Sequence, residues 1–111
     1  MRFGACRCLD PQDRTRDDEL EYLAGVEVTG EVDISAGMVR WEIPAIRCAR
    51  FTHRGPVTTF SETLSYVYGS WFPRSSYEPS MAYELERYDE RFKLDAPDSE
   101  WDYFVGLETP A

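Results

Sequence analysis

Six short stretches of the chain are predicted to be strands, and in several of them hydrophobic and polar residues alternate, a pattern typical of strands with one buried face. These stretches are residues 3–9, 22–28, 38–43, 46–53, 81–88 and 101–107. Turn-forming pairs such as Asp10-Pro11 and Gly55-Pro56 interrupt the pattern. Residues 10–21 are polar and mostly acidic, which predicts an exposed connection between the first two strands.

One helix is predicted between the fourth and fifth strands. Apolar side chains recur there at helical spacing, at Phe60, Leu64, Val67, Tyr68 and Trp71. Thr59 and Glu62 have the spacing of a capping box at its start, and Pro73 ends it. The order β-β-β-β-α-β-β predicts an α+β fold, an antiparallel sheet with one long helix.

The length and net charge of the chain argue against several classes of function. The 111 residues fit one domain, and 12 basic against 21 acidic side chains leave a net charge of −9. This acidity argues against direct binding of nucleic acid, which requires clustered Lys and Arg. No apolar run is long enough for a membrane span or a signal peptide. With only three cysteines, we expect a cytoplasmic protein that binds neither membrane nor nucleic acid.

The cysteines and the single histidine raise two further hypotheses. Cys6, Cys8, Cys48 and His53 could supply four zinc ligands, but their spacing is unlike that of zinc sites. Cys48 and His53 stand five positions apart on one strand, so they should point to opposite faces and cannot form a catalytic pair. Buried thiols, and a histidine that hydrogen-bonds a turn, are the favoured interpretation. We therefore expect no metal and no cofactor.

Two carboxylates in the fifth predicted strand are the strongest candidate for chemistry. Glu84 and Glu86 share one face with Tyr88, whereas Tyr83 and Leu85 share the other. If the second set packs under the helix, the carboxylates emerge on the face away from it. They then belong either to the polar outer face of a half-exposed sheet or to the floor of a cleft lined by aromatic residues. Aromatic residues form 14% of the chain and could line such a cleft.

Several ordered blocks of the sequence resemble the GyrI-like family, the effector-binding domains of AraC-type and MerR-type activators and of gyrase inhibitory proteins. Residues 43–55, IPAIRCARFTHRG, resemble the family segment "iPaGrYavfthrG", and residues 86–92, ERYDERF, resemble "fErYderf". The other similar blocks are residues 2–11, 21–28, 61–79 and 99–107. Ile46 stands where the family has Gly, and Gly106 where it has Pro.

The resemblance implies a single effector-binding-like domain over residues 1–111. Residues 38–111 correspond to a complete second half, and residues 1–37 to a remnant hairpin of a first half that lacks its opening strand and helix. One wall of the family pocket would then be missing. Either the cleft is open, or a second copy completes it. A homodimer is the expectation, because it would cover an exposed sheet edge.

The resemblance also implies a ligand. In the family, a glutamate on the "fErY" strand attracts lipophilic cations into an aromatic pocket, and Glu86 has that position here. Tyr88 and Phe104 are expected to share its face, whereas Trp71, Tyr22 and Trp41 are weaker candidates because each could belong to the core. A carboxylate beside aromatic faces suits a poorly hydrated organic cation. The leading hypothesis is therefore a stand-alone, non-enzymatic receptor for amphipathic, cationic aromatic compounds.

Two other functions stay open. The first is a protein-interaction or inhibitor module, in which the acidic surface imitates DNA phosphates toward a basic partner. The second is a hydrolase of strained electrophiles, with Glu86 as general base and Tyr88 as acid.

Overall fold

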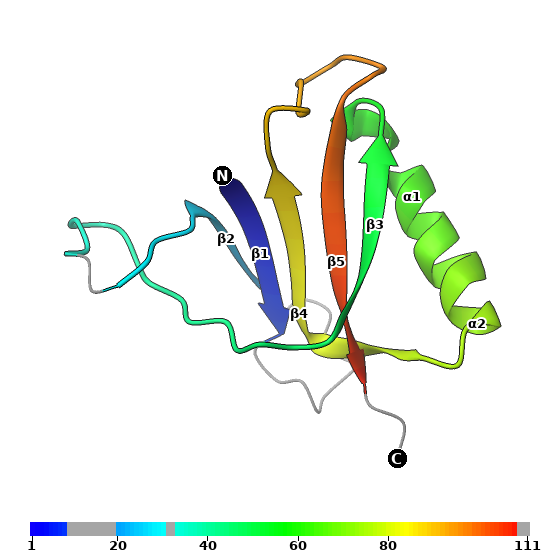
Figure 1. The fold of residues 1–111 in the computed structure, drawn as a ribbon, viewed down its shortest axis with the longest axis horizontal. Coiled ribbons are helices and arrows are strands. Elements are labelled where there is room, and N and C mark those ends of the chain that lie inside the picture. The colour runs from blue at the N-terminus through cyan, green and yellow to red at the C-terminus, as the bar shows by residue number, and fades with distance from the viewer. Residues whose placement is uncertain (9–19, 31–32, 109–111) are drawn as a thin grey trace.

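A five-stranded antiparallel sheet forms the centre of the molecule (Figure 1). The computed structural model describes residues 1–8, 20–30 and 33–108. Within these ranges the strand order is β2-β1-β4-β5-β3. The strands are β1 (Arg2–Cys8), β2 (Leu20–Val26), β3 (Cys48–Arg54), β4 (Glu78–Tyr88) and β5 (Glu100–Glu108). The predicted α+β class, an antiparallel sheet with one long helix, is confirmed. Most of the acidic connection predicted at 10–21 lies outside the described residues.

The long helix follows β3 and changes its winding along its length. It comprises a 3-10 turn η1 (Val57–Thr59), α1 (Phe60–Tyr66), a π segment η2 (Val67–Trp71) and α2 (Phe72–Arg74). The predicted capping box is wrong, because Thr59 makes no side-chain cap bond. The helical winding already begins at Val57, so the Thr59 hydroxyl donates instead to the Pro56 carbonyl, 3.0 Å away.

The predicted apolar stripe of the helix packs on the sheet. Val67 and Phe72 form a buried cluster with Tyr103 and Val105 of β5. The neighbours packed against this cluster are Phe51, Phe60, Leu64, Trp71, Tyr77 and Leu107. The helix therefore covers the β3 and β5 half of one sheet face. In the described residues no helix covers the β1 and β2 half of that face (Figure 1).

Strand register decides which side chains share the helix-bearing face. Glu86 pairs with Gly4 of β1 and with Tyr103 of β5, and residues directly opposite one another in a sheet point to the same side. Because Tyr103 packs under the helix, Glu84 and Glu86 lie on the helix-bearing face. The prediction that they emerge away from the helix is wrong. The side chains under the helix come from β5 and β3, not from Tyr83 and Leu85.

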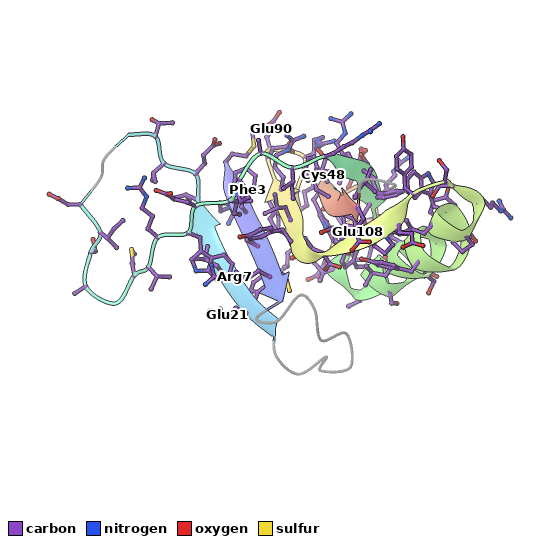
Figure 2. The ribbon with its side chains drawn as sticks, turned by 90° about the horizontal axis from the view of Figure 1, so that it is seen from below. Phe3, Arg7, Glu21, Cys48, Glu90 and Glu108 are labelled. Carbon is purple, nitrogen blue, oxygen red and sulfur yellow. The ribbon has the colours of Figure 1, made fainter. Side chains whose placement is uncertain are left out.

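The strand predicted at 38–43 is absent. This segment is not part of any strand of the sheet. Arg40 and Glu42 form an ion pair, with N and O 3.3 Å apart. The centroid of the Trp41 ring lies 4.0 Å from the guanidinium carbon of Arg7. Figure 2 shows Arg7 on β1 beside Glu21 of β2, whose carboxylate it binds at 3.2 Å.

His53 has the structural role that its sequence position indicates. It is 2% exposed, with Nδ1 2.6 Å from the Thr63 hydroxyl and Nε2 3.1 Å from the Pro56 carbonyl oxygen. Cys48 and His53 point to opposite faces of β3, as predicted. Cys6 and Cys48 are partly exposed, so the expectation of fully buried thiols is wrong for these two.

Neither a membrane-spanning helix nor a metal-binding cluster is found in the described part of the chain. Its helices are too short or too polar to cross a bilayer. No group of three or more His, Cys, Asp or Glu side chains there is arranged to hold a metal ion.

Candidate functional site

The carboxylate of Glu86 lies between two tyrosine hydroxyls. Tyr22, from β2, donates to Oε1 at 3.1 Å, and Tyr88, from β4, donates to Oε2 at 2.8 Å. Hydrogen bonds to an ionised acceptor are about twice as strong as those between neutral groups. The two phenols therefore fix the position of the carboxylate on the uncovered half of the sheet face.

Gly4 leaves the space that the Tyr22 ring needs to reach Glu86. It lies on β1, between Glu86 on one side and Ala24 on the other. A methyl group at residue 4 would overlap the Tyr22 hydroxyl and stand 2.8 Å from Oε1 of Glu86. The missing side chain is what lets the Tyr22 ring lie across β1 and reach the carboxylate.

A pocket of about 410 Å³ opens beside these groups. It lies at the end of the sheet where β1 begins and where β2 and β4 end. Its lining is mainly aromatic and aliphatic: Arg2, Phe3, Tyr22, Ala24, Gly25, Val26, Tyr88 and Phe92. Glu86 does not line the pocket itself but is bonded to Tyr22 and Tyr88, which do. The volume lies within the usual range for small-molecule sites.

The aromatic wall of the pocket rests on the core. Phe92 meets Tyr88 edge to face, with ring centroids 4.8 Å apart. Both rings pack against Trp101 of β5, and each ring centroid lies 5.7 Å from that of Trp101. Trp101 is 1% exposed. Packing against the buried Trp101 side chain thus fixes the positions of the Tyr88 and Phe92 rings before any ligand binds.

The two phenols that bind Glu86 resist ionisation. Burial, followed by the charge and hydrogen bond of Glu86, raises the pKa of Tyr22 to about 12. Burial and the hydrogen bond to Glu86 raise the pKa of Tyr88 as well. Both hydroxyls therefore stay protonated near neutral pH and act as hydrogen-bond donors.

Glu84 forms a second, separate contact one strand pleat away. Tyr68, from the π segment of the helix, donates to Oε1 of Glu84 at 2.6 Å. Its oxygen also lies 3.0 Å from the hydroxyl of the buried Tyr103. This contact ties the helix to β4 beside the uncovered part of the sheet.

Comparison with known proteins agrees with this geometry. Residues 5–105 match the family described as GyrI-like small molecule binding domain. The chain belongs to this family. The match includes β2 and β4, which carry Tyr22, Glu86 and Tyr88. It begins within β1, after Gly4, and stops three residues before β5 ends.

A curated relative of this GyrI-like chain is the transcriptional regulator BrlR of Pseudomonas aeruginosa. The two are 35% identical over 91 residues, which are 80% of this chain and 33% of BrlR. The chain therefore spans about a third of the length of that regulator.

The GyrI-like block at residues 86–92 divides its side chains between the two faces of the sheet. Glu86 and Tyr88 belong to the site, and Phe92 supports it. Arg87 points to the opposite face, where it and Arg91 bind the carboxylate of Asp102 at 2.7 and 2.9 Å. The block thus places candidate-site residues on one face of the sheet and an ion cluster on the other.

The structure brings together three of the six site residues expected from the sequence, Glu86, Tyr88 and Tyr22. Phe104 pairs with Leu85 on the opposite face, where the guanidinium carbon of Arg87 lies 5.0 Å from its ring centroid. Trp71 packs against Phe51, Phe72 and Tyr77 at the core, and Trp41 lies beside Arg7. These last three are therefore remote from Glu86.

Seven residues of the site were not expected from the sequence. They are Gly4 and the pocket residues Arg2, Phe3, Ala24, Gly25, Val26 and Phe92. Phe92 is the last residue of the block that resembles "fErYderf", and this position beside Glu86 and Tyr88 in one motif could have indicated that it belongs to the site. The role of Gly4 depends on the register between β1 and β4, which the sequence pattern does not specify. Arg2 and Val26 face one another across β1 and β2 and join the site for the same reason.

Gly4→Ala is expected to displace Tyr22 from Glu86 and to lower the pKa of Tyr22 from about 12 toward the ordinary value of 10.0. Because folding raises this pKa, the stabilising contribution of the phenol is complete below pH 10 and is lost as pH rises through 12. Tyrosinate absorption followed against pH, with Tyr22→Phe to identify its component, measures the change.

The matched control is Gly69→Ala, in the helix, where an added methyl group meets nothing within 4 Å. It should leave the tyrosinate titration unchanged. If Gly4→Ala did the same, the close approach of Tyr22 to Glu86 across β1 would be contradicted.

Proposed function

We propose that this GyrI-like chain is a receptor for amphipathic, cationic aromatic molecules, with Glu86 as the anionic group beneath an aromatic pocket. One observation carries the proposal. A carboxylate held by two phenol hydroxyls lies directly beside a mainly apolar pocket of about 410 Å³. The family match supports small-molecule binding, and the charge and ring geometry support the ligand class.

The chemistry of the site favours such a guest. A delocalised organic cation is weakly hydrated, so it loses little when it leaves water. The faces of Tyr22, Tyr88 and Phe92 can each contribute a cation–π contact of about 0.5–2 kcal/mol. Charge attraction to Glu86 then selects cations over neutral aromatic molecules of the same size.

The same geometry favours binding over acid–base catalysis. Burial, with the hydrogen bond to Glu86, raises the pKa of Tyr88, so this phenol is a poor acid for a substrate. Its proton is also already committed to Glu86, at 2.8 Å. A receptor requires only that the two phenols and the carboxylate hold their positions.

Glu86→Gln is expected to weaken the binding of a lipophilic cationic dye, the ethyl ester of rhodamine B, by about tenfold or more. Glutamine keeps the size of the side chain but removes its charge, and its NH2 group cannot accept the phenol hydrogen bond that the second carboxylate oxygen accepts. A tenfold loss of affinity corresponds to about 1.4 kcal/mol. Fluorescence anisotropy of the dye, titrated with protein, measures the affinity of each variant.

Glu90→Gln provides the matched control, because Glu90 is exposed beyond the end of β4 and its replacement removes the same charge. Equal affinities of the Glu86 and Glu90 variants would contradict the proposed role of Glu86. A parent protein that binds no dye at all would favour the protein-interaction alternative.

A further inference from the structure

The pocket beside Glu86 also contains a positive charge, which a receptor for simple cations does not need. Arg2 lines the pocket together with Tyr22, Val26 and Tyr88. In β1 it stands two residues before Gly4, and its strand partners are Tyr88 and Val26. Arg2 and Glu86 therefore belong to the same sheet face, one pleat apart.

Arg2 is exposed and is not neutralised by its described neighbours. Within residues 1–8, 20–30 and 33–108, its side chain makes neither an ion pair nor a hydrogen bond. By contrast, Arg7 on the same strand is paired with Glu21 at 3.2 Å. The guanidinium of Arg2 thus keeps its full hydrogen-bonding capacity at the edge of the pocket.

Resting on the proposed function, we propose that the preferred ligand is zwitterionic: an aromatic molecule with its cationic centre toward Glu86 and a carboxylate or similar anionic group toward Arg2. Arg2 on β1 is a diagonal neighbour of Glu86 on β4, because Glu86 pairs with Gly4. Diagonal neighbours in a sheet are about 7–8 Å apart, and an aromatic ring system spans that distance. Arginine suits the anionic end because its planar guanidinium can bind a carboxylate through two parallel hydrogen bonds.

Arg2 would also disfavour other guests. A molecule with positive charge alone meets attraction at Glu86 and repulsion at Arg2, whereas a zwitterion of matching length meets attraction at both. Selection by a repulsive group against the wrong ligand is a common source of specificity. The positive charge of Arg2 in the pocket and the negative charge of Glu86 beside it therefore define a direction for the ligand.

Two forms of one dye test this inference. Rhodamine B is a zwitterion with a free benzoate, and its ethyl ester is a cation with the same ring system. We expect the parent protein to bind the zwitterion about three- to tenfold more tightly than the ester, a modest ratio because Arg2 is exposed. Added salt should reduce the ratio, because exposed charges are screened.

Arg2→Gln should abolish the preference for the zwitterion and strengthen binding of the ester, because it removes the repulsion that a cation meets at Arg2. Arg50→Gln is the matched control, since Arg50 is exposed and pairs with Phe104 on the opposite face. It should preserve the preference. If the parent and Arg2→Gln proteins both bound the two dyes equally, the role of Arg2 would be overturned.

The Glu86 variant separates this inference from the proposed function. If Glu86→Gln weakens binding of both dyes but neither the parent nor Arg2→Gln distinguishes them, the receptor proposal stands and the zwitterion proposal fails. If Glu86→Gln weakens neither dye, the proposed function itself fails.

Discussion

Replacing Trp101 by alanine is expected to lower the free energy of unfolding by about 3–5 kcal/mol, the usual cost of truncating a fully buried large aromatic side chain. Trp101 is 1% exposed. The centroid of its ring lies 4.4 Å from that of His53 and 5.3 Å from that of Phe60. The ring centroids of Tyr88 and Phe92 each lie 5.7 Å from it. Such a loss is a large fraction of the 5–15 kcal/mol that typically stabilises a domain. Chemical denaturation measures it.

The same substitution should weaken dye binding by the molecules that remain folded. Tyr88 and Phe92 line the pocket, and Trp101 supports both from the core side. Trp101→Phe should be much milder in both respects. It keeps a ring in the cluster, and it removes a buried indole N–H that has no hydrogen-bond partner in the described structure.

Trp41→Ala is the matched control. The Trp41 ring is only partly buried, with the guanidinium carbon of Arg7 4.0 Å from its centroid. Its loss should cost about 1 kcal/mol or less, as for a cation–π contact near the surface. A Trp101→Ala protein as stable as Trp41→Ala would contradict the packing described for the aromatic cluster.

The sequence predicts the helix and most of the sheet because their periodicity coincides with their burial. Phe60, Leu64 and Val67 recur at helical spacing and do pack against β5. Residues 38–43 alternate equally well but are unpaired. Alternation indicates an extended backbone, whereas a strand also requires a hydrogen-bonding neighbour.

The structure brings together Glu86, Tyr88 and Tyr22, three of the residues expected to share a site, but it places Phe104 elsewhere. Alternation shows that Glu86 and Tyr88 share a face, yet it does not show which face lies under the helix. It also does not relate one strand to the next. The pairing of Leu85 with Phe104 places that ring on the opposite side. Register is set by contacts between distant segments, so no local pattern contains it.

The ion cluster on the opposite face should be the other main determinant of stability. Asp102, whose side chain is 4% exposed, accepts hydrogen bonds from Arg87 at 2.7 Å, Thr52 at 2.8 Å and Arg91 at 2.9 Å. These groups come from β3, from β4 and from the turn that follows β4, so one carboxylate joins three segments of the chain.

Asp102→Ala is expected to cost about 3 kcal/mol of unfolding free energy, the lower end of the range for breaking a buried ion pair. The lower end applies because Arg87 and Arg91 are 29% and 36% exposed, so water can partly solvate the guanidinium groups left behind. Denaturation by urea, read by tryptophan fluorescence, measures the loss.

The pH dependence of stability provides a second readout for Asp102. Burial alone would raise its pKa, but the hydrogen bonds from Arg87, Thr52 and Arg91 outweigh burial and hold the pKa below the ordinary 3.8. Folding therefore lowers this pKa, so the stabilisation is present above pH 3.8 and is lost as pH falls through the lowered value. The parent protein should lose this increment in acid, whereas Asp102→Ala should lack it at every pH.

Asp98→Ala is the control, because Asp98 and its partner Lys93 are 57% and 58% exposed, and it should barely change the urea midpoint at neutral pH. If the two variants unfolded at the same urea concentration, the Asp102 cluster would have no special part in holding β3 and β4 to β5.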